Sequence, residues 1–470
     1  MESKVQGMTT VEAEEDNQVV KITSDNTKDE WLISIDKYVH EKTKKTPIER
    51  VPLLLRKHKS YKNCCEPLLV SIGPYHHANP KFQAFEKMKI PFAQKFCHVC
   101  CDQVSIEQLY EEVAKVGKSA RECYEEDPTA RYDDELFNRM MFLDACFVLH
   151  FMFILRMENS SNWMDKELKD VYEQLYKNLY HVVGDLFLLE NQIPLVVLNV
   201  LMKFMKKFKG NYIENFLELF SIEPPQTNSC TDAVKNFLKQ MTGCCSESNA
   251  KEKPNLDESP HLLHFLREKL IFPLQPKGTN QDAMRRELYL SVTELKSAGI
   301  FFIPSQTRNL TVVEFKSRLI YGILSLPPVR VDDVSKNILL NLVAYEMCPH
   351  GPPDLYITSY ICLMNSLIDH ADDVKELKKR RILINHLGSD EQLAEFFNEL
   401  STDLAPDIFA YADAKSQIDE HCKQKGHIWM AEWIHKYFTS PWTLLAFLGA
   451  IFALALTMVQ TYFAVYPRQT

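Results

Sequence analysis

Two adjacent histidines and two acidic residues in apolar surroundings are the residues of this sequence best suited to acid–base chemistry. His76 and His77 follow a Gly73-Pro74 turn, and Asp185 and Glu190 lie in mostly apolar sequence. Histidine titrates near neutral pH, and a nearby carboxylate could supply the partner acid or base of a hydrolase or transferase. No serine or cysteine at motif spacing identifies a nucleophile. A catalytic role therefore requires these four side chains to converge in one pocket.

A structural role accounts for the same residues with fewer requirements. A histidine in a turn commonly hydrogen-bonds the backbone. Acids such as Asp144, Asp185 and Glu190 more often cap helices or pair with an arginine than catalyse a reaction, because an unpaired buried charge is costly. The candidate arginine partners are Arg139, Arg156 and Arg267. We therefore favour the structural interpretation, and no catalytic residue is assigned from the sequence.

The cysteines give a weak indication of a metal site. Cys97, Cys100 and Cys101 contain one Cys-x-x-Cys spacing, and Cys64-Cys65 and His76-His77 lie earlier in the chain. A structural zinc site needs four ligands, usually from two such pairs, and this spacing matches no standard pattern. Packed thiols are the simpler explanation, and we expect no cofactor.

A second apparent motif, Gly117-Lys118-Ser119, also lacks its context. A phosphate-binding loop needs a glycine at position 112, where Glu112 stands, and a preceding strand. The flanking residues have helical spacing instead. No serine-hydrolase, zinc-protease, calcium-loop or dinucleotide motif occurs, so the sequence favours a protein without enzymatic activity.

Composition places the chain among ordinary globular proteins with an acidic balance. It has 470 residues, 25% charged and 46% hydrophobic, and a net charge of −9. This charge gives no basic field for nucleic acid, so we expect no nucleic-acid partner. Only 13 glycines are present, which disfavours folds built on glycine-rich loops. The 13 cysteines are predicted to be reduced thiols in the cytosol.

The C-terminal region predicts a membrane span. Between Trp442 and Tyr466 only the tyrosines are ionisable. A helix over residues 443–465 would be roughly 35 Å long, enough for a hydrocarbon core of about 30 Å. A buried core helix, the alternative, usually keeps a polar face, and none exists from Leu444 to Leu456. We assign a transmembrane helix to residues 441–466 and a short tail to 467–470.

The charges around this span predict its orientation. Lysines and histidines precede it between residues 421 and 437, whereas only Arg468 follows it. By the positive-inside rule the N-terminal domain is cytosolic, which makes a single-pass, tail-anchored protein. Residues 1–28 form an acidic arm of disordered composition without a signal-peptide core. We expect the plasma membrane rather than the endoplasmic reticulum. The 421–437 flank could also bind anionic lipid head groups.

Apolar spacing predicts a mainly helical domain over residues 29–438. Residues 136–155 are the most apolar internal segment, yet they contain Asp144 and His150, so they are expected to form the central helix of a soluble core. Gly388 ends one helix, and Ser389 with Gln392 caps the next. Other predicted helices span 31–44, 82–96 with a break near Pro91, 168–189, 261–270, 334–345, 357–371, 372–387, 391–400 and 409–437. Short strands are predicted at 68–77 and within a β element at 300–331, and residues 221–260 form a loop-rich insertion.

Several stretches, taken together and in order, resemble one family. The most specific are Val70-Ser-Ile-Gly-Pro-Tyr-His-His77 and Asp185-Leu-Phe-Leu-Leu-Glu-Asn-Gln-Ile-Pro194; Val51-Pro-Leu-Leu-Leu-Arg56 and Asn341-Leu-Val-Ala-Tyr-Glu346 accompany them. The sequence is similar to the plant "domain of unknown function 247" proteins over residues 30–466. The resemblance implies one C-terminal anchor, no assigned catalytic residue or cofactor, and roles connected with self-incompatibility, stress or defence.

Two function classes follow. The first is a membrane-anchored interaction or signalling module whose cytosolic domain binds another protein, while residues 441–466 bind the bilayer. The second is a membrane-tethered hydrolase or transferase that uses His76 and His77 with Asp185 or Glu190. The relative placement of these four side chains discriminates between the two.

Overall fold

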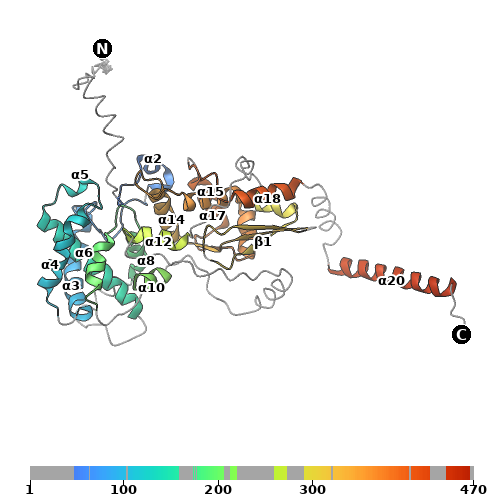
Figure 1. The fold of residues 1–470 in the computed structure, drawn as a ribbon, viewed down its shortest axis with the longest axis horizontal. Coiled ribbons are helices and arrows are strands. Elements are labelled where there is room, and N and C mark those ends of the chain that lie inside the picture. Colours follow the sequence, from blue (N-terminus) through green and yellow to red (C-terminus); the bar gives the residue numbers. More distant parts are fainter. Residues whose placement is uncertain are drawn as a thin grey trace, which may run out of the picture. The chain divides into compact units, whose positions relative to one another are not determined.

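The structure, a computed structural model, describes most of the chain from residue 47 onwards (Figure 1). The described residues are 47–62, 64–101, 104–157, 173, 175, 177–205, 212–219, 259–271, 291–307, 309–318, 321–401, 404–423 and 441–465. The predicted acidic arm, the helix at 31–44, nearly all of the insertion at 221–260, the flank at 424–437 and the tail lie outside them. The predicted class, mainly α with a small β element, is confirmed.

The most apolar internal segment forms α6 (Asp134–Met157), the helix around which the first half of the domain packs. Its neighbours are α3 (Gln83–Cys100), α4 (Ile106–Arg121), α9 (Leu195–Met202) and α10 (Tyr212–Leu219). Among the described residues, the Asp134–Leu155 segment is long and apolar enough to cross a membrane, but most of it is buried within the protein. This burial fits the predicted core helix.

Several helices of the second half begin at clear capping residues. Asp332 caps α14 (Asp333–Glu346), and Ser389 with Gln392 forms the predicted capping box of α17 (Asp390–Leu400). The other helices here are α12 (Leu262–Leu270), α13 (Val292–Ser297), α15 (Tyr356–Leu367), α16 (Ala371–Lys379) and α18 (Ala412–Lys423). Satisfying the free N–H groups of a first turn stabilises a helix by about 1 kcal/mol, so these local signals fix where the helices start.

Two small sheets form the β element. In the first, with strand order β1-β3-β2, β3 (Gly322–Leu326) pairs in parallel with β1 (Ile300–Pro304) and antiparallel with β2 (Glu314–Ser317). In the second, β4 (Val329–Val331) pairs in parallel with β5 (Leu383–Asn385). The short helices and turns that complete the fold are α2 (Leu53–Arg56), η1 (Lys59–Tyr61), η2 (Pro80–Phe82), α5 (Glu126–Thr129) and α8 (Leu179–Leu186).

Three local predictions were wrong. Residues 68–77 form no strand, because side chains rather than a neighbouring strand bind their N–H groups. Helix α3 continues through Pro91 instead of breaking there. The predicted helix at 372–387 ends at Lys379, where Arg381 adopts a positive φ of 58°, and the chain then enters β5.

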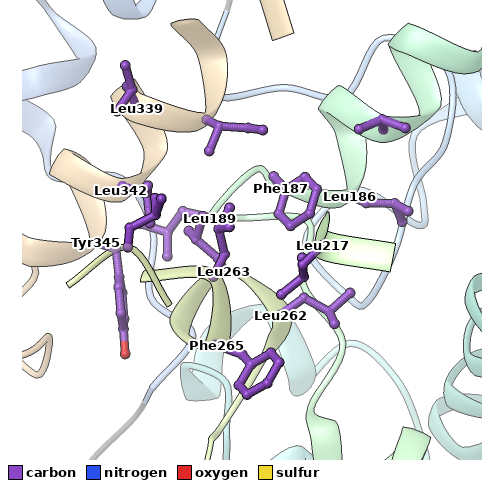
Figure 2. Close-up of a cluster of buried hydrophobic side chains, with 14 of the residues drawn as sticks. Leu186, Phe187, Leu189, Leu217, Leu262, Leu263, Phe265, Leu339, Leu342 and Tyr345 are labelled. Carbon is purple, nitrogen blue, oxygen red and sulfur yellow. The ribbon is translucent and has the colours of Figure 1, made fainter. Parts of the chain in front are cut away.

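Side chains from α8, α12 and α14 meet in one apolar core (Figure 2). Leu186 and Phe187 come from the end of α8, Leu263 from α12 and Leu342 from α14, and all are buried. Segments distant in the chain therefore meet at the segment that follows α8. That segment carries the acidic candidate Glu190, so core packing positions the candidate site.

The last described helix is α20 (Pro441–Val465), 25 residues long. Apolar side chains in its central part are exposed, including Phe452 at 67%, Leu454 at 63% and Met458 at 73%. The apolar stretch Gly449–Thr461 within this helix is shorter than a membrane span.

Candidate functional site

The residues before the two histidines form an extended segment whose N–H groups are bound by buried side chains. Asp185 accepts hydrogen bonds from the backbone N–H groups of Leu68, Leu69 and Val70, each at 2.8 Å. Burial raises the pKa of Asp185, and these hydrogen bonds oppose the shift because they favour the charged form. Both carboxylate oxygens are engaged, so Asp185 holds this segment in place and is poorly suited to accept a proton from a substrate.

The same segment is held further along by Asn191 and Asp144. Asn191 Oδ1 accepts the Ile72 N–H at 2.7 Å, and Asp144 Oδ2 accepts the Gly73 N–H at 2.8 Å. Gly73 has a φ of 71°, and an added Cβ would lie 2.8 Å from the Gln192 carbonyl oxygen. The Gly-Pro turn therefore requires glycine for its conformation and for its close contact with the 185–194 segment.

Glu190 lies opposite His76 and belongs to a partly buried ion pair. Its Oε1 accepts the Val51 N–H at 2.7 Å and also binds the Arg56 guanidinium. Its Oε2 lies 3.9 Å from His76 Nε2, which is beyond direct hydrogen-bond distance. Burial raises the pKa of Glu190, whereas the Arg56 charge opposes the shift. Burial, assisted by the Arg56, Lys81 and Arg50 charges, lowers the pKa of His76 to about 4.

His77 belongs to a different network. Its Nδ1 lies 3.3 Å from Glu86 Oε2, and Glu86 Oε1 accepts a hydrogen bond from Lys89 Nζ at 2.6 Å. Lys89 is completely buried and also donates to Asp144 Oδ1 and to the Ser71 carbonyl, both at 2.5 Å. The Lys89 ammonium thus links α3 to the extended segment and to α6.

Of the four predicted acid–base residues, the structure brings two together. His76 and Glu190 face each other, whereas His77 turns to Glu86 and Asp185 binds backbone N–H groups. Within the part of the chain that is described, the buried His76 Nε2 atom has no hydrogen-bond partner. A neutral His76 could exchange a proton with Glu190 only through a bridging molecule such as water.

The ion-pair partners differ from the arginines that the sequence suggested. Lys89 pairs with Asp144, and Arg56 pairs with Glu190. Arg267 instead binds Glu346 on α14, with Nε at 2.8 Å from Oε1. Lys89 was missed because a lysine in an amphipathic helix looks like a surface residue. Arg56 ends the Val-Pro-Leu-Leu-Leu-Arg stretch, and nothing else in the sequence indicates that it pairs with Glu190.

The candidate metal ligands lie in the packed core. Cys97, Cys100 and Cys101 are buried near the end of α3, and the Cys97 thiol is hydrogen-bonded to Cys146 of α6. Among the described residues, no group of three or more His, Cys, Asp and Glu side chains is arranged to hold a metal ion. Burial raises the pKa of Cys65 to about 12, so this thiol near Glu190 stays protonated and is a poor nucleophile.

The Gly117-Lys118-Ser119 stretch lies inside α4, as the helical spacing predicted. An added Cβ at Gly117 would lie 2.0 Å from Asn138 Oδ1, so the glycine permits close packing of α4 against α6. No open loop exists there to hold a phosphate.

Comparison with known proteins places these features in a family. The model of DUF247, described as "Plant protein of unknown function", matches residues 48–456. UPF0481 protein At3g47200 of Arabidopsis thaliana is 28% identical over 415 residues, 87% of this chain and 83% of the relative. Putative UPF0481 protein At3g02645 of the same plant is 23% identical over 517 residues, 93% of this chain and 94% of the relative. No solved structure matches the chain significantly.

Proposed function

The chain belongs to the DUF247 family of plant proteins, and on this premise we propose that it is a membrane-anchored interaction or signalling module without enzymatic activity. The observation that carries the proposal is how the candidate acids are used. Asp185 binds three backbone N–H groups, and Glu190 binds Arg56 and the Val51 N–H. Side chains that hold segments of the fold together are poorly placed to cycle between protonation states during catalysis.

Membrane anchoring is supported by the exposed apolar surface of α20. Phe452, Leu454 and Met458 are each more than half exposed, although such side chains normally avoid water. A 25-residue helix is roughly 37 Å long, and a hydrocarbon core is about 30 Å thick. In this proposal α20 spans the bilayer once and the helical domain lies in the cytosol, at the plasma membrane.

A reducing compartment agrees with the core thiols. Cys64, Cys65, Cys97 and Cys146 are buried and form no disulfide. Thiols persist in the cytosol, whereas a secreted domain of this size would commonly use some of them as disulfides. The helical domain would then present its surface to a cytosolic protein in a recognition, stress or defence process.

Two measurements on the full chain in plant membranes test the proposal. Replacing Leu454 and Phe452 by arginine should release the chain from microsomes during carbonate washing, because charged residues at the centre of a span are strongly disfavoured. Phe301, an exposed aromatic residue of β1, supplies the matched control: Phe301→Arg should leave the chain in the membrane fraction. Retention of the Leu454→Arg/Phe452→Arg variant would refute the anchor.

The interaction role is tested by crosslinking in the same membranes. A defined protein should be crosslinked to the helical domain, and purified chain should turn over no metabolite. Turnover that requires His76, together with the absence of any crosslinked protein, would overturn this part of the proposal.

A second candidate function, a membrane-tethered hydrolase or transferase, is favoured by one observation. His76 Nε2 and Glu190 Oε2 lie 3.9 Å apart, close enough for one water molecule to bridge them. His76 would then act as the base, with Glu190 orienting the bridging water. His76→Ala and Glu190→Gln should abolish turnover in that case, whereas His77→Ala should have little effect.

A further inference from the structure

A short surface segment, residues 52–62, exposes two adjacent leucines on a rigid support. Leu53 is 77% exposed and Leu54 is 62% exposed, whereas Leu55 beside them is buried. All three lie in the single turn of α2. Exposed leucines scattered singly are ordinary, but two neighbouring ones at these exposures form an apolar tip that a partner surface could cover.

Contacts on the inner side of this segment hold the tip in position. Arg56 binds the buried Glu190, and the Tyr61 hydroxyl donates to the Leu340 carbonyl at 3.0 Å. Ser60 Oγ donates to Glu399 Oε2 at 3.2 Å. The middle and the C-terminal end of the segment are therefore fixed to the rest of the domain, and the leucines cannot turn inward without breaking these contacts.

Three lysines follow the two exposed leucines closely in the sequence. Lys57, Lys59 and Lys62 are exposed within the next eight residues after Leu54. Lys59 pairs with Glu399 at 3.1 Å but is still 79% exposed, and no described ion pair engages Lys57 or Lys62. This local excess of positive charge contrasts with the net charge of −9 of the whole chain.

We propose that this segment, the 52–62 tip, docks on anionic lipid head groups, with Leu53 and Leu54 entering the interface. The inference rests on the proposed anchoring by α20 and adds the surface by which the helical domain lies on the membrane. Apolar side chains combined with lysines are the pair of signals that gives peripheral binding to anionic membranes. Because α20 keeps the domain beside the bilayer, two leucines and three lysines suffice without the affinity that a free protein would need.

A bilayer explains the tip better than a protein surface does. Two leucines bury too little area for a specific protein interface, which needs roughly 800 Å² on each partner. The flexible, exposed lysines suit a diffuse layer of lipid phosphates and carboxylates, whereas protein interfaces contain few lysines.

Leu136 provides a matched control. It is 41% exposed at the start of α6 and follows three acidic residues, Asp133, Asp134 and Glu135. An anionic surface should repel this leucine. A Leu136→Ser substitution removes the same kind of exposed side chain from the opposite electrostatic setting.

The test uses the full chain in nanodiscs that hold one copy each. Discs contain phosphatidylcholine alone or phosphatidylcholine with phosphatidylserine, and amide hydrogen exchange is followed by mass spectrometry. The N–H groups of Leu53 and Leu54 lie in the first turn of α2, where no intrahelical acceptor is available, so they exchange quickly unless covered. We expect exchange there to be slower by about tenfold or more in the anionic discs, since each lysine strengthens binding about fivefold.

Two double variants distinguish lipid binding from other causes of slow exchange. Leu53→Ser/Leu54→Ser and Lys57→Glu/Lys62→Glu should each abolish the difference between the two discs, and Leu136→Ser should preserve it. Equal exchange of the wild-type tip in neutral and anionic discs would overturn the proposal. Protection that appears in neutral discs only after a second protein is added would assign the tip to a protein partner and would also overturn it.

Failure of the anchor gives a separate result. If α20 does not insert, the chain will not enter nanodiscs, and flotation with vesicles of the same two compositions replaces them. Binding to anionic vesicles that is lost in Lys57→Glu/Lys62→Glu would then support docking while the anchor is refuted. No binding to either vesicle would refute both.

Discussion

Lys89→Met should destabilise the protein more than most single substitutions. Lys89 is completely buried and donates to Glu86, Asp144 and the Ser71 carbonyl at 2.5–2.6 Å. Methionine has a similar length and keeps the packing, so the substitution removes the charge and its hydrogen bonds. Asp144, only 1% exposed, then retains the Gly73 N–H as its described donor.

The magnitude follows from leaving a buried charge without its partner. Removing one member of a buried ion pair costs about 3–5 kcal/mol, a large part of the roughly 5–15 kcal/mol by which domains are stable. Asp144→Asn keeps an acceptor for the Gly73 N–H and removes the charge. The double variant Lys89→Met/Asp144→Asn should therefore lose about 1–3 kcal/mol less than the sum of the single losses.

The pH dependence of the stability loss provides a second, independent test of the Lys89–Asp144 ion pair. Burial raises the pKa of Asp144, and Lys89 opposes this shift. Without Lys89 the shift becomes larger, so folded Asp144 binds a proton that unfolded Asp144 releases above a pH of about 4. The deficit of Lys89→Met should therefore grow as pH rises from about 4 and shrink as pH falls.

Pulse proteolysis of the full chain in detergent, across a urea series, measures these changes in unfolding free energy. Lys87→Met on the same helix is the control, because Lys87 is exposed and its loss should change stability by less than about 0.5 kcal/mol. A Lys89→Met loss below about 1 kcal/mol, or a loss independent of pH, would refute the assigned ion pair.

Two further predictions concern glycines and His76. Gly184→Ala should stabilise α8 by about 0.5–1 kcal/mol, because an added Cβ meets nothing within 4 Å; Gly117→Ala should destabilise, because its Cβ would lie 2.0 Å from Asn138 Oδ1. Thermal midpoints compare the two, and equal shifts would contradict the packing. Because the pKa of His76 is lowered to about 4, its contribution to stability is fully present above a pH of about 6.5 and is lost as the pH falls towards 4. His76→Gln should flatten that fall in pulse proteolysis; an unchanged slope would show that His76 is freely protonated.

Local sequence signals predicted the helices better than the extended segments. The capping boxes at Asp332 and Ser389 satisfy first-turn N–H groups within three residues, so both are visible in the sequence. The segment at 68–77 is different, because Asp185 and Asn191 supply its acceptors from more than a hundred residues away. An apolar run with remote partners has the same pattern as a strand.

The short strand β5 shows the same limitation. Its residues continue the helical spacing of α16, and the pattern alone predicted one helix over 372–387. The positive φ of Arg381 redirects the chain, and β5 then pairs in parallel with β4, more than fifty residues earlier. Neither the turn nor the pairing has a local signal strong enough to outweigh helical periodicity.

Residue type limits what the sequence can say about the candidate site for a related reason. A buried polar network and an active site both place carboxylates and histidines in apolar sequence, so residue type cannot separate them. The two can be distinguished by whether the oxygen and nitrogen atoms of these side chains already have hydrogen-bond partners. Asp185 has its oxygens filled by backbone N–H groups, whereas Glu190 Oε2 faces the unbonded His76 Nε2. We therefore expect loss of Asp185 to unfold the segment rather than to stop a reaction.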